Sequence, residues 1–334
     1  MLRFFREKSI LSGILLLVLC IALKLPSIIQ QRHYDYIQTA PLSRLFFHYL
    51  IGVNNHILWS LLASATIVFL QSLMLNYIVS QQNILYKDTF LPALFYILIN
   101  SFYPQQAELT PQLISATFIL LLFQRLCFLY ESQKPLLLVF DAGMYLGFGI
   151  LFNYDLSVFL PFILISVVIF TSFNIRYFII SILGIFVPLY FTAIIFYLND
   201  NLNELLFFVK QSFEKQLLKT INTSITEFIP GLLLFPIVLV SGFELQQHFF
   251  RNKVKTRRII QSVGLMMLFG VFSLFIENTN YVYAICYLSI PMSIVTAYFF
   301  INEKKYLLKE LIFIALIVLS YYYQFNLDFH HVYH

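Results

Sequence analysis

The chain has 334 residues, of which 60% are hydrophobic and only 11% are charged, whereas about 25% of residues are charged in ordinary soluble proteins. Its mean hydropathy is +0.81, which excludes a soluble globular domain and predicts an integral membrane protein. The formal net charge of +5 does not indicate a nucleic-acid partner, because the basic residues gather at the edges of the apolar segments. Neither GxxxxGK[ST] nor GxGxxG occurs in the chain, so the sequence contains no nucleotide-binding loop of these kinds.

The N-terminal segment carries Arg3, Arg6 and Lys8 before an apolar run, a pattern that also begins a signal peptide. No A-x-A-like cleavage site follows, and no small residue precedes Cys20 as a lipoprotein cleavage box would require. Many further apolar runs come after it. We therefore expect this run to be an uncleaved first membrane span.

Eleven apolar segments have the length and composition of membrane spans or slightly shorter helices. The sequence thus predicts an all-α, polytopic transmembrane bundle that forms a single integral membrane domain over 1–334. The predicted spans are 9–26, 56–79, 89–103, 113–130, 136–152, 156–173, 177–198, 228–243, 259–276, 281–301 and 311–326.

The distribution of basic residues predicts the orientation of these spans. Cytoplasmic connections carry an excess of Lys and Arg, and an N-terminus inside with a C-terminus outside places 14 of the 21 basic residues there. The outer segments then hold six, and Arg125 lies within a span. The inner residues are Arg3, Arg6, Lys8, Lys87, Lys134, Arg176, Arg251, Lys253, Lys255, Arg257, Arg258, Lys304, Lys305 and Lys309, and the outer ones are Lys24, Arg32, Arg44, Lys210, Lys215 and Lys219.

Two outer segments are long enough to contain structure of their own. The first, 26–55, ends in a short amphipathic stretch over Leu42–Ile51. The second, 199–227, repeats apolar residues from Leu202 to Ile225 at three- and four-residue spacing, with polar residues largely between them. This spacing predicts a helix that lies in the outer headgroup region of the membrane.

Two charges lie inside apolar runs on either side of the short turn ESQKP. Arg125 precedes this turn and Asp141 follows it. Because antiparallel spans joined by so short a turn place the two residues at similar depth, roughly 8 Å into the membrane, we expect a structural ion pair that offsets the cost of burying each charge. The alternative is that Arg125 reaches the inner headgroups while Asp141 faces a cavity.

The remaining candidates for chemistry are carboxylates in the outer connections, namely Asp35, Glu108, Asp155 and Glu227. A carboxylate at the membrane surface can act as a general base towards an acceptor hydroxyl, or it can hold a divalent cation through its oxygens. Outer loops also carry charges merely because they are wet, and this simpler reading applies to each residue. Basic residues of the same outer segments could contact a lipid-linked phosphate, and these are Arg32, Arg44, Lys210 and Lys215. Cys20, Cys127 and Cys286 all lie in apolar runs without CxxC spacing, so we expect buried thiols.

Residues 80–210 resemble a family of uncharacterised polytopic inner-membrane proteins of Bacteroidetes. The resemblance depends on Phe140–Gly147, which reads FDAGMYLG, on Phe173–Arg176, which reads FNIR, and on Leu91–Tyr96, which reads LPALFY. It implies a multi-pass location in the bacterial inner membrane and carries no established activity.

The layout of the chain also resembles the GT-C superfamily, the integral-membrane glycosyltransferases that use lipid-linked sugars. One span leads to an outer loop with an acid at Tyr34-Asp35-Tyr36, closely connected spans follow to the seventh, and a long amphipathic outer segment comes next. The resemblance implies a seven-span module over 1–198 with the outer loop 26–55, the amphipathic segment 199–227, and four further spans over 228–334. It also implies that Asp35 is the catalytic base. The first loop is short, and the acidic pairs common in that superfamily are absent here.

Three functions follow as hypotheses. The first is transfer of a sugar or similar group from a polyprenyl-phosphate donor at the periplasmic face, with Asp35 as base, Glu108 and Asp155 in contact with acceptor or metal, and cationic side chains on phosphate. The second is a non-catalytic membrane subunit or scaffold of an envelope-assembly or secretion complex, bound to membrane-protein partners. The third is a transporter of a lipid-linked glycan or small solute, which requires polar residues along the centre of the bundle.

Overall fold

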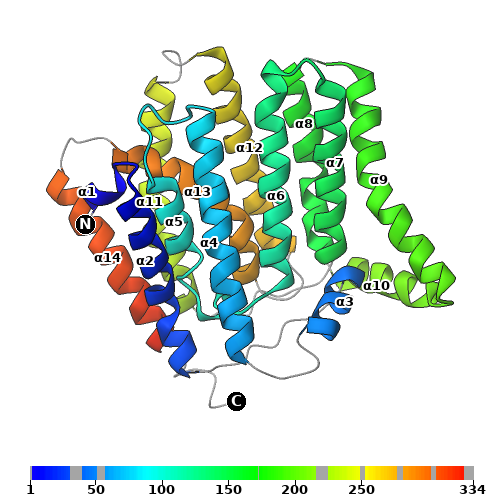
Figure 1. Ribbon diagram of the computed structural model, residues 1–334, viewed down its shortest axis with the longest axis horizontal. Helices are drawn as coiled ribbons and strands as arrows, with labels where there is room; N and C mark the ends of the chain where they lie inside the picture. The colour runs from blue at the N-terminus through cyan, green and yellow to red at the C-terminus, as the bar shows by residue number, and fades with distance from the viewer. Residues whose placement is uncertain are drawn as a thin grey trace.

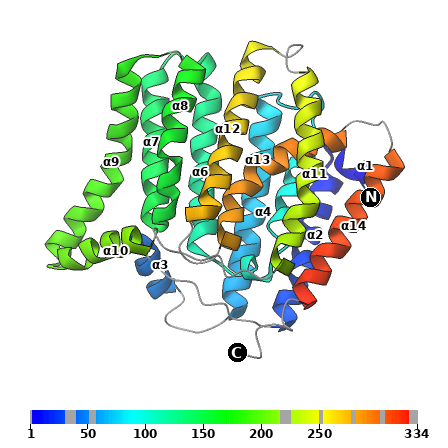
Figure 2. The same cartoon turned by 180° about the vertical axis from the view of Figure 1, so that it is seen from behind.

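The computed structural model describes residues 2–30, 40–50, 57–171, 173–215, 225–248, 253–276, 281–301 and 306–326. Every regular element in these ranges is helical, which confirms the predicted all-α polytopic class. Figures 1 and 2 show long helices packed side by side, most of them running between two opposite ends of the bundle.

The helices follow one another along the chain with short connections. They are α1 (Leu2–Phe5), α2 (Ile10–Gln30), α3 (Pro41–Leu50), α4 (Ile57–Gln81), α5 (Leu91–Ile99), η1 (Pro104–Gln106), α6 (Pro111–Phe128), η2 (Leu129–Glu131), α7 (Pro135–Phe152), η3 (Tyr154–Phe159), α8 (Leu160–Thr171), α9 (Ile175–Leu198), α10 (Leu202–Lys215), α11 (Ile225–His248), α12 (Val254–Ile276), α13 (Tyr281–Ile301) and α14 (Tyr306–Asn326).

Nine helices among the described residues are long and apolar enough to cross a membrane, so the chain is a multi-pass membrane protein. They correspond to nine of the eleven predicted spans. The segment predicted at 228–243 is part of α11, whose apolar stretch is Leu234–Gln246. The prediction of a span over 89–103 is wrong: α5 has nine residues, about 13 Å of helix at ~1.5 Å per residue, less than half of a bilayer core of about 30 Å.

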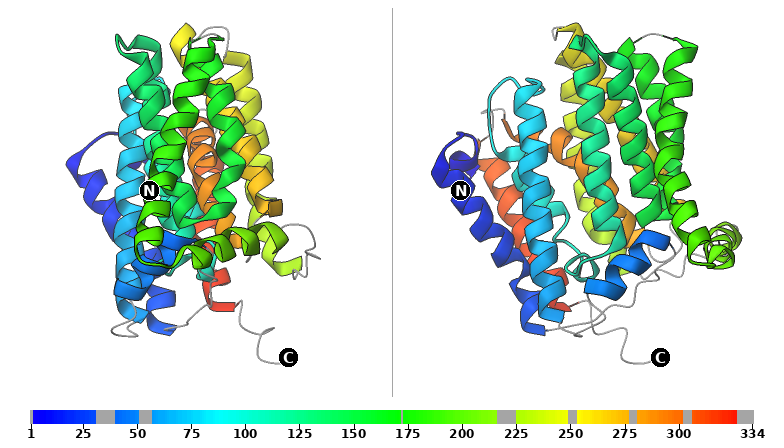
Figure 3. Two further views of the ribbon diagram at one scale, coloured as in Figure 1. Left: turned by 90° about the vertical axis from the view of Figure 1, so that its right-hand side faces the viewer. Right: turned by 45° about the vertical axis from the view of Figure 1, so that its right-hand side comes forward.

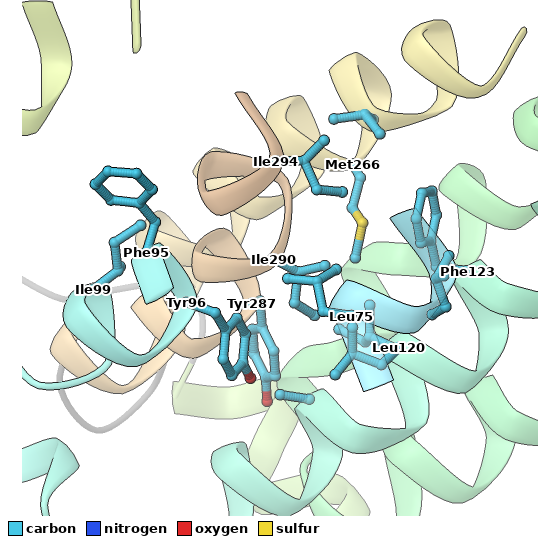
Figure 4. Close-up of a cluster of buried hydrophobic side chains, with 14 of the residues drawn as sticks. Leu75, Phe95, Tyr96, Ile99, Leu120, Phe123, Met266, Tyr287, Ile290 and Ile294 are labelled. Carbon is cyan, nitrogen blue, oxygen red and sulfur yellow. The ribbon is translucent and has the colours of Figure 1, made fainter. Parts of the chain in front are cut away.

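Other helices enclose the short helix α5 completely. All nine of its residues are buried, and α13, α4 and α2 pack around it. Phe95 of α5 lies 4.6 Å, centroid to centroid, from Phe300 of α13. Helix α13 is the most enclosed of the described spans, because 83% of its apolar stretch is buried. Figure 4 shows side chains of α5 and α13 meeting in this core. Apolar runs of similar composition therefore have two different structures in this chain: most cross the membrane, and one forms a short internal helix.

Helices α7 and α9 approach each other closely at glycines. A Cβ added at Gly143 would lie closer than 3.0 Å to the carbonyl oxygen of Ser181, and one added at Gly184 would lie closer than 3.0 Å to that of Phe140. At Gly147 it would meet the Ile185 carbonyl oxygen at 2.6 Å. Gly143 and Gly147 form a GxxxG spacing, which lets membrane helices pack backbone to backbone.

Side-chain caps and prolines fix where several helices begin. Thr110 accepts a hydrogen bond from the Leu113 amide and Pro111 occupies the first turn of α6. Asn174 accepts one from the Arg176 amide at the start of α9, and Asn153 does the same for the Asp155 amide at the start of η3. These caps satisfy amides that the first helical turn leaves without intrahelical partners.

The two amphipathic segments lie at one end of the bundle, which we call the α10 end. Figures 1 and 3 show α10 lying across this end, with α3 beside it. Helix α10 packs against α9 and η3, and α3 packs against α7. The sequence predicts both helices, although α10 ends at Lys215 and residues 216–224 lie outside the described residues.

Candidate functional site

The structure divides the predicted site residues into three groups. Asp35 and Arg32 lie outside the described residues, as does the side chain of Lys215, so their predicted roles remain predictions. Arg44 on α3 and Lys210 on α10 are exposed at the α10 end. Glu108 and Asp155, expected at the membrane surface, are instead only 3% and 2% exposed.

Asp155, Arg44 and Lys210 are carried by elements that meet around the last turn of α7. Asp155 belongs to η3, which packs against α7, α8 and α10. The Phe46 ring of α3 lies 5.9 Å from that of Phe152, which joins α3 to the same turn. We call this meeting place of α3, η3 and α10 the α10 junction. It brings one buried carboxylate and two exposed cations to a single part of the α10 end.

A polar contact holds the start of η3 against α13, the most enclosed helix. Asn153 Nδ2 donates to the hydroxyl of Tyr287 on α13 at 2.8 Å, and both side chains are buried. In Figure 4 Tyr287 lies beside Tyr96 of α5, whose hydroxyl donates to Gln71 Oε1 of α4 at 2.8 Å. Two buried tyrosines thus connect the core helices through hydrogen bonds rather than through apolar contact alone.

An apolar cavity of about 500 Å³ opens next to the α10 junction. Helix α9 contains Pro188 and leans away from α7 towards this end in Figures 1 and 2, as proline-kinked helices do. The volume lies within the range of small-molecule sites. Its lining comes from five elements and consists of Ile150, Tyr154, Ser157, Leu160, Leu164, Ile182, Ile185, Phe186, Leu189 and Val209.

Glu108 belongs to a different surrounding, the buried connection 100–110 between α5 and α6. Every residue of this connection is buried, although it contains several amides and the carboxyl of Glu108. Gln106 Nε2 donates to the Val282 carbonyl at 2.6 Å, Ser60 Oγ accepts from the Leu109 amide at 3.0 Å, and Gln324 Nε2 donates to the Ser101 carbonyl at 2.5 Å. Non-helical backbone at membrane depth is tolerated where protein encloses it in this way.

The prediction that Lys24 belongs to an outer connection is also wrong, because this residue lies within the α2 span and is 1% exposed. Its Nζ donates to Ser64 Oγ of α4 and to the Ala107 carbonyl of the buried connection, the latter at 3.3 Å. Both partners are neutral. The signal available in the sequence was its position inside the predicted span 9–26, two residues before that span ends.

A second apolar cavity of about 260 Å³ lies between α11, α12 and α13, and Ile84 and Leu85 also line it. It is smaller and has few polar groups, with Gln246 and Tyr298 at its wall. No predicted site residue lines it.

Arg125 and Asp141 form the predicted contact between α6 and α7. Arg125 Nε lies 3.5 Å from Asp141 Oδ2, with 36% and 19% of the two side chains exposed. The guanidinium also lies 5.9 Å from the centre of the Tyr145 ring, and its Nη2 donates to the Tyr145 hydroxyl at 3.4 Å. The two charges therefore meet inside a helix hairpin, where each lowers the cost of the other.

A metal site among the predicted carboxylates receives no support in the described part of the chain, where no three His, Cys, Asp or Glu residues gather as potential ligands. The three cysteines are buried and form no disulfide in the described part of the chain, in agreement with the expected buried thiols.

Comparison with known proteins identifies a family without an assigned activity. Residues 36–332 match the family described as a family of unknown function, DUF6427. No curated protein and no solved structure matches the chain. The match spans most of the sequence and agrees with the resemblance to an uncharacterised family of polytopic membrane proteins, while the GT-C resemblance remains an expectation from layout. The chain therefore belongs to the DUF6427 family of unknown function.

Proposed function

We propose that the protein is an inner-membrane group transferase that takes a polyprenyl-phosphate-linked donor at the periplasmic face, in the manner of GT-C glycosyltransferases. The observation that supports this most is the apolar cavity beside the α10 junction. A prenyl chain must stay in an apolar environment while its phosphate meets a water-soluble acceptor, and the edge of a membrane bundle is where both conditions hold.

The lining of the cavity suits such a donor. Val209 of α10 forms part of the wall, and Lys210 is the next residue along the same helix. An amphipathic helix at the membrane surface holds its apolar side against the chain and its cations among the phosphates. Arg44 on α3 supplies a further cation at the same junction, and Lys215 and Arg32 are the remaining candidates for phosphate.

The catalytic roles in the proposal are those expected from the sequence. Asp35 is the general base, and the loop that carries it connects α2 with α3. Asp155 in η3 is the carboxylate at the α10 junction, and because it is only 2% exposed, its role in the proposal is to orient the base rather than to contact the acceptor. Glu108 lies in the buried connection, and its burial argues for a structural task rather than for direct contact with an acceptor.

The test compares two pairs of variants in a strain in which loss of the protein gives a measurable envelope defect. We expect Asp35→Asn to abolish complementation at a normal protein level, since removal of a general base typically costs ~10²–10⁴ in rate. Asp200→Asn is the matched control, because Asp200 is an exposed carboxylate two residues before the start of α10. Full complementation by Asp35→Asn would refute its role as base.

The cavity is tested in the same strain by filling it. Leu164→Trp places a large ring in the cavity and should abolish complementation, whereas Ile260→Trp fills the smaller apolar cavity and should be tolerated. Equal complementation by both tryptophan variants would remove the support for a donor tail in the larger cavity.

A transporter is the second candidate, and the interrupted helix α5 favours it. Transporters form binding sites from broken helices whose backbone lines an internal path, and α5 with the connection 100–110 is such an interruption. Transport and transfer differ in one readout: reconstituted vesicles would accumulate solute in the first case and would release a modified acceptor in the second.

A further inference from the structure

We infer that Lys24 is the cationic anchor of a binding site for a phosphate group with a hydroxyl-bearing substituent, enclosed between α2, α4 and the connection 100–110. This site lies away from the α10 junction: α2 packs against α4, α5 and α14, whereas α9 and α10 pack with α7, α8 and η3. In Figures 1 and 2 these two sets occupy opposite sides of the bundle.

The argument begins with the charge of Lys24. An ionisable residue inside a membrane span is costly and is by default a candidate for function. Within the described ranges, the recorded ion pairs join Arg125 with Asp141 and Lys255 with Glu131, and Lys24 Nζ has only the Ser64 hydroxyl and the Ala107 carbonyl as hydrogen-bond partners. Neutral dipoles solvate an ammonium but leave its charge uncompensated, so an anion would complete the site.

The second observation is a set of buried acceptors in the same connection. Gln105 and Gln106 immediately precede Ala107, and the side-chain oxygens of both have no hydrogen-bond partner among the described residues, as is true of Asn100. Gln106 is 3% exposed and Asn100 is fully buried. A buried amide oxygen without a donor costs stability, and a ligand that brings O–H groups would satisfy it.

The two observations define the ligand by its chemistry. A compact ammonium is a point-charge partner for phosphate oxygens, and amide oxygens accept from hydroxyls. A phosphate ester of a sugar or polyol offers both groups in one molecule. It could come from water, as a sugar phosphate, or from a lipid, as a headgroup.

Because Lys24 has no charged partner among the residues that the structure describes, its replacement separates a binding role from a structural one. Lys24→Met removes the uncompensated charge and keeps an apolar stem, and replacing buried charges by apolar residues is often neutral or stabilising. If Lys24 serves binding, the ligand-free variant unfolds at the wild-type temperature or higher. If Lys24 only holds the connection, the variant unfolds at a clearly lower temperature.

The experiment measures the unfolding temperature of the purified full chain in detergent, with glucose 1-phosphate, with glucose, or with dioctanoyl phosphatidylglycerol mixed into the micelles. We expect wild type to be stabilised by several degrees at saturating phosphate ester, since a ligand that binds only the folded state raises its stability, and glucose alone to give no shift. Lys24→Met should weaken binding at least tenfold, and Lys134→Met, which removes an exposed cation at the start of α7, should leave it unchanged.

The arms of the experiment also assign the source of the ligand. A shift with glucose 1-phosphate alone assigns a soluble ester, and a shift with phosphatidylglycerol alone that is lost in Lys24→Met assigns a lipid headgroup. No shift of the wild-type protein with either ester overturns the inference, as does an unchanged shift in Lys24→Met. Should Lys24→Met not fold, Ser64→Ala must still weaken binding severalfold. These experiments measure only ligand binding, so their outcome is independent of the complementation tests of group transfer.

Discussion

The close approach of α7 and α9 gives a sharp prediction for Gly143→Ala. The new methyl group would meet the Ser181 carbonyl oxygen at a distance that real Cβ atoms essentially never show. Because the obstacle is backbone and not a flexible side chain, the helices must separate by roughly 1 Å, and inserting a methyl into so tight an interface typically costs about 1–3 kcal/mol. A glycine-to-alanine change in a helix also gains about 0.5–1 kcal/mol, so we expect a net loss of ~1–2 kcal/mol.

The measurement uses the buried thiols of Cys20, Cys127 and Cys286 as reporters, since a thiol-reactive dye labels them only when the bundle unfolds. A loss of ~1–2 kcal/mol should lower the unfolding temperature by a few degrees in a chain of this size. The matched control is Gly264→Ala in α12, where an added Cβ has nothing within 4 Å and should leave the temperature unchanged or raise it.

Gly143 and Gly184 face each other, so their substitutions should not add. The Cβ built at each lies 3.2 Å from the Cα of the other, and helices already separated by one alanine accommodate the second more cheaply. We expect Gly143→Ala with Gly184→Ala to cost clearly less than the sum of the single changes. An unfolding temperature for Gly143→Ala at or above that of Gly264→Ala would refute the reasoning.

Two further predictions concern charge. Arg125→Met should lower the stability of the folded protein by about 2 kcal/mol, less than the ~2.5–3.5 kcal/mol of a lone charge at mid-membrane, because Arg125 lies near the end of α6. The double variant Arg125→Met with Asp141→Leu should recover most of the unfolding temperature. Equal losses in the single and the double variant would show that the pair contributes nothing. Cysteines at Lys87 and Lys134 should be labelled by an impermeant reagent only from the cytoplasm, and a cysteine at Lys210 only from the periplasm. Labelling at Lys87 and Lys134 from the periplasm would contradict the inside N-terminus, and labelling at Lys210 from the cytoplasm would contradict the placement of α10.

The sequence could predict those parts of the fold that depend on apolar length and on helical spacing. The long spans, the amphipathic α10 and the contact between Arg125 and Asp141 all follow from patterns within a few dozen residues. Helix α5 could not be recognised as a short internal helix. An apolar run indicates that a segment avoids water, but it does not indicate whether lipid or protein covers the segment. The glycine contacts depend on α9 meeting α7, which no single segment reveals.

The candidate site was predictable to a smaller extent. Patterning placed Arg44, Lys210 and Asp155 at the same end, and the structure brings the elements that carry them together. The sequence pattern did not show that Glu108 and Asp155 are buried. A carboxylate in a short connection looks the same in the sequence whether the connection faces water or folds inward. Lys24 was missed for the opposite reason: a cation near the edge of an apolar run is usually at the surface, and here the connection 100–110 covers it.

The enclosure of α5 has a consequence for how the chain is made. Helix α5 is too short to be inserted as a span of its own, and its polar connection finds acceptors and donors in Val282 of α13 and in Gln324 of α14, residues that leave the ribosome some 180 to 220 positions later. Until α13 and α14 are made, the polar connection lacks these partners and stays in a partly assembled bundle, in contact with water or with the insertion machinery. Closure of the centre is therefore a late step of assembly, and a chain interrupted before α13 should be degraded by membrane proteases even though its first spans are already in place.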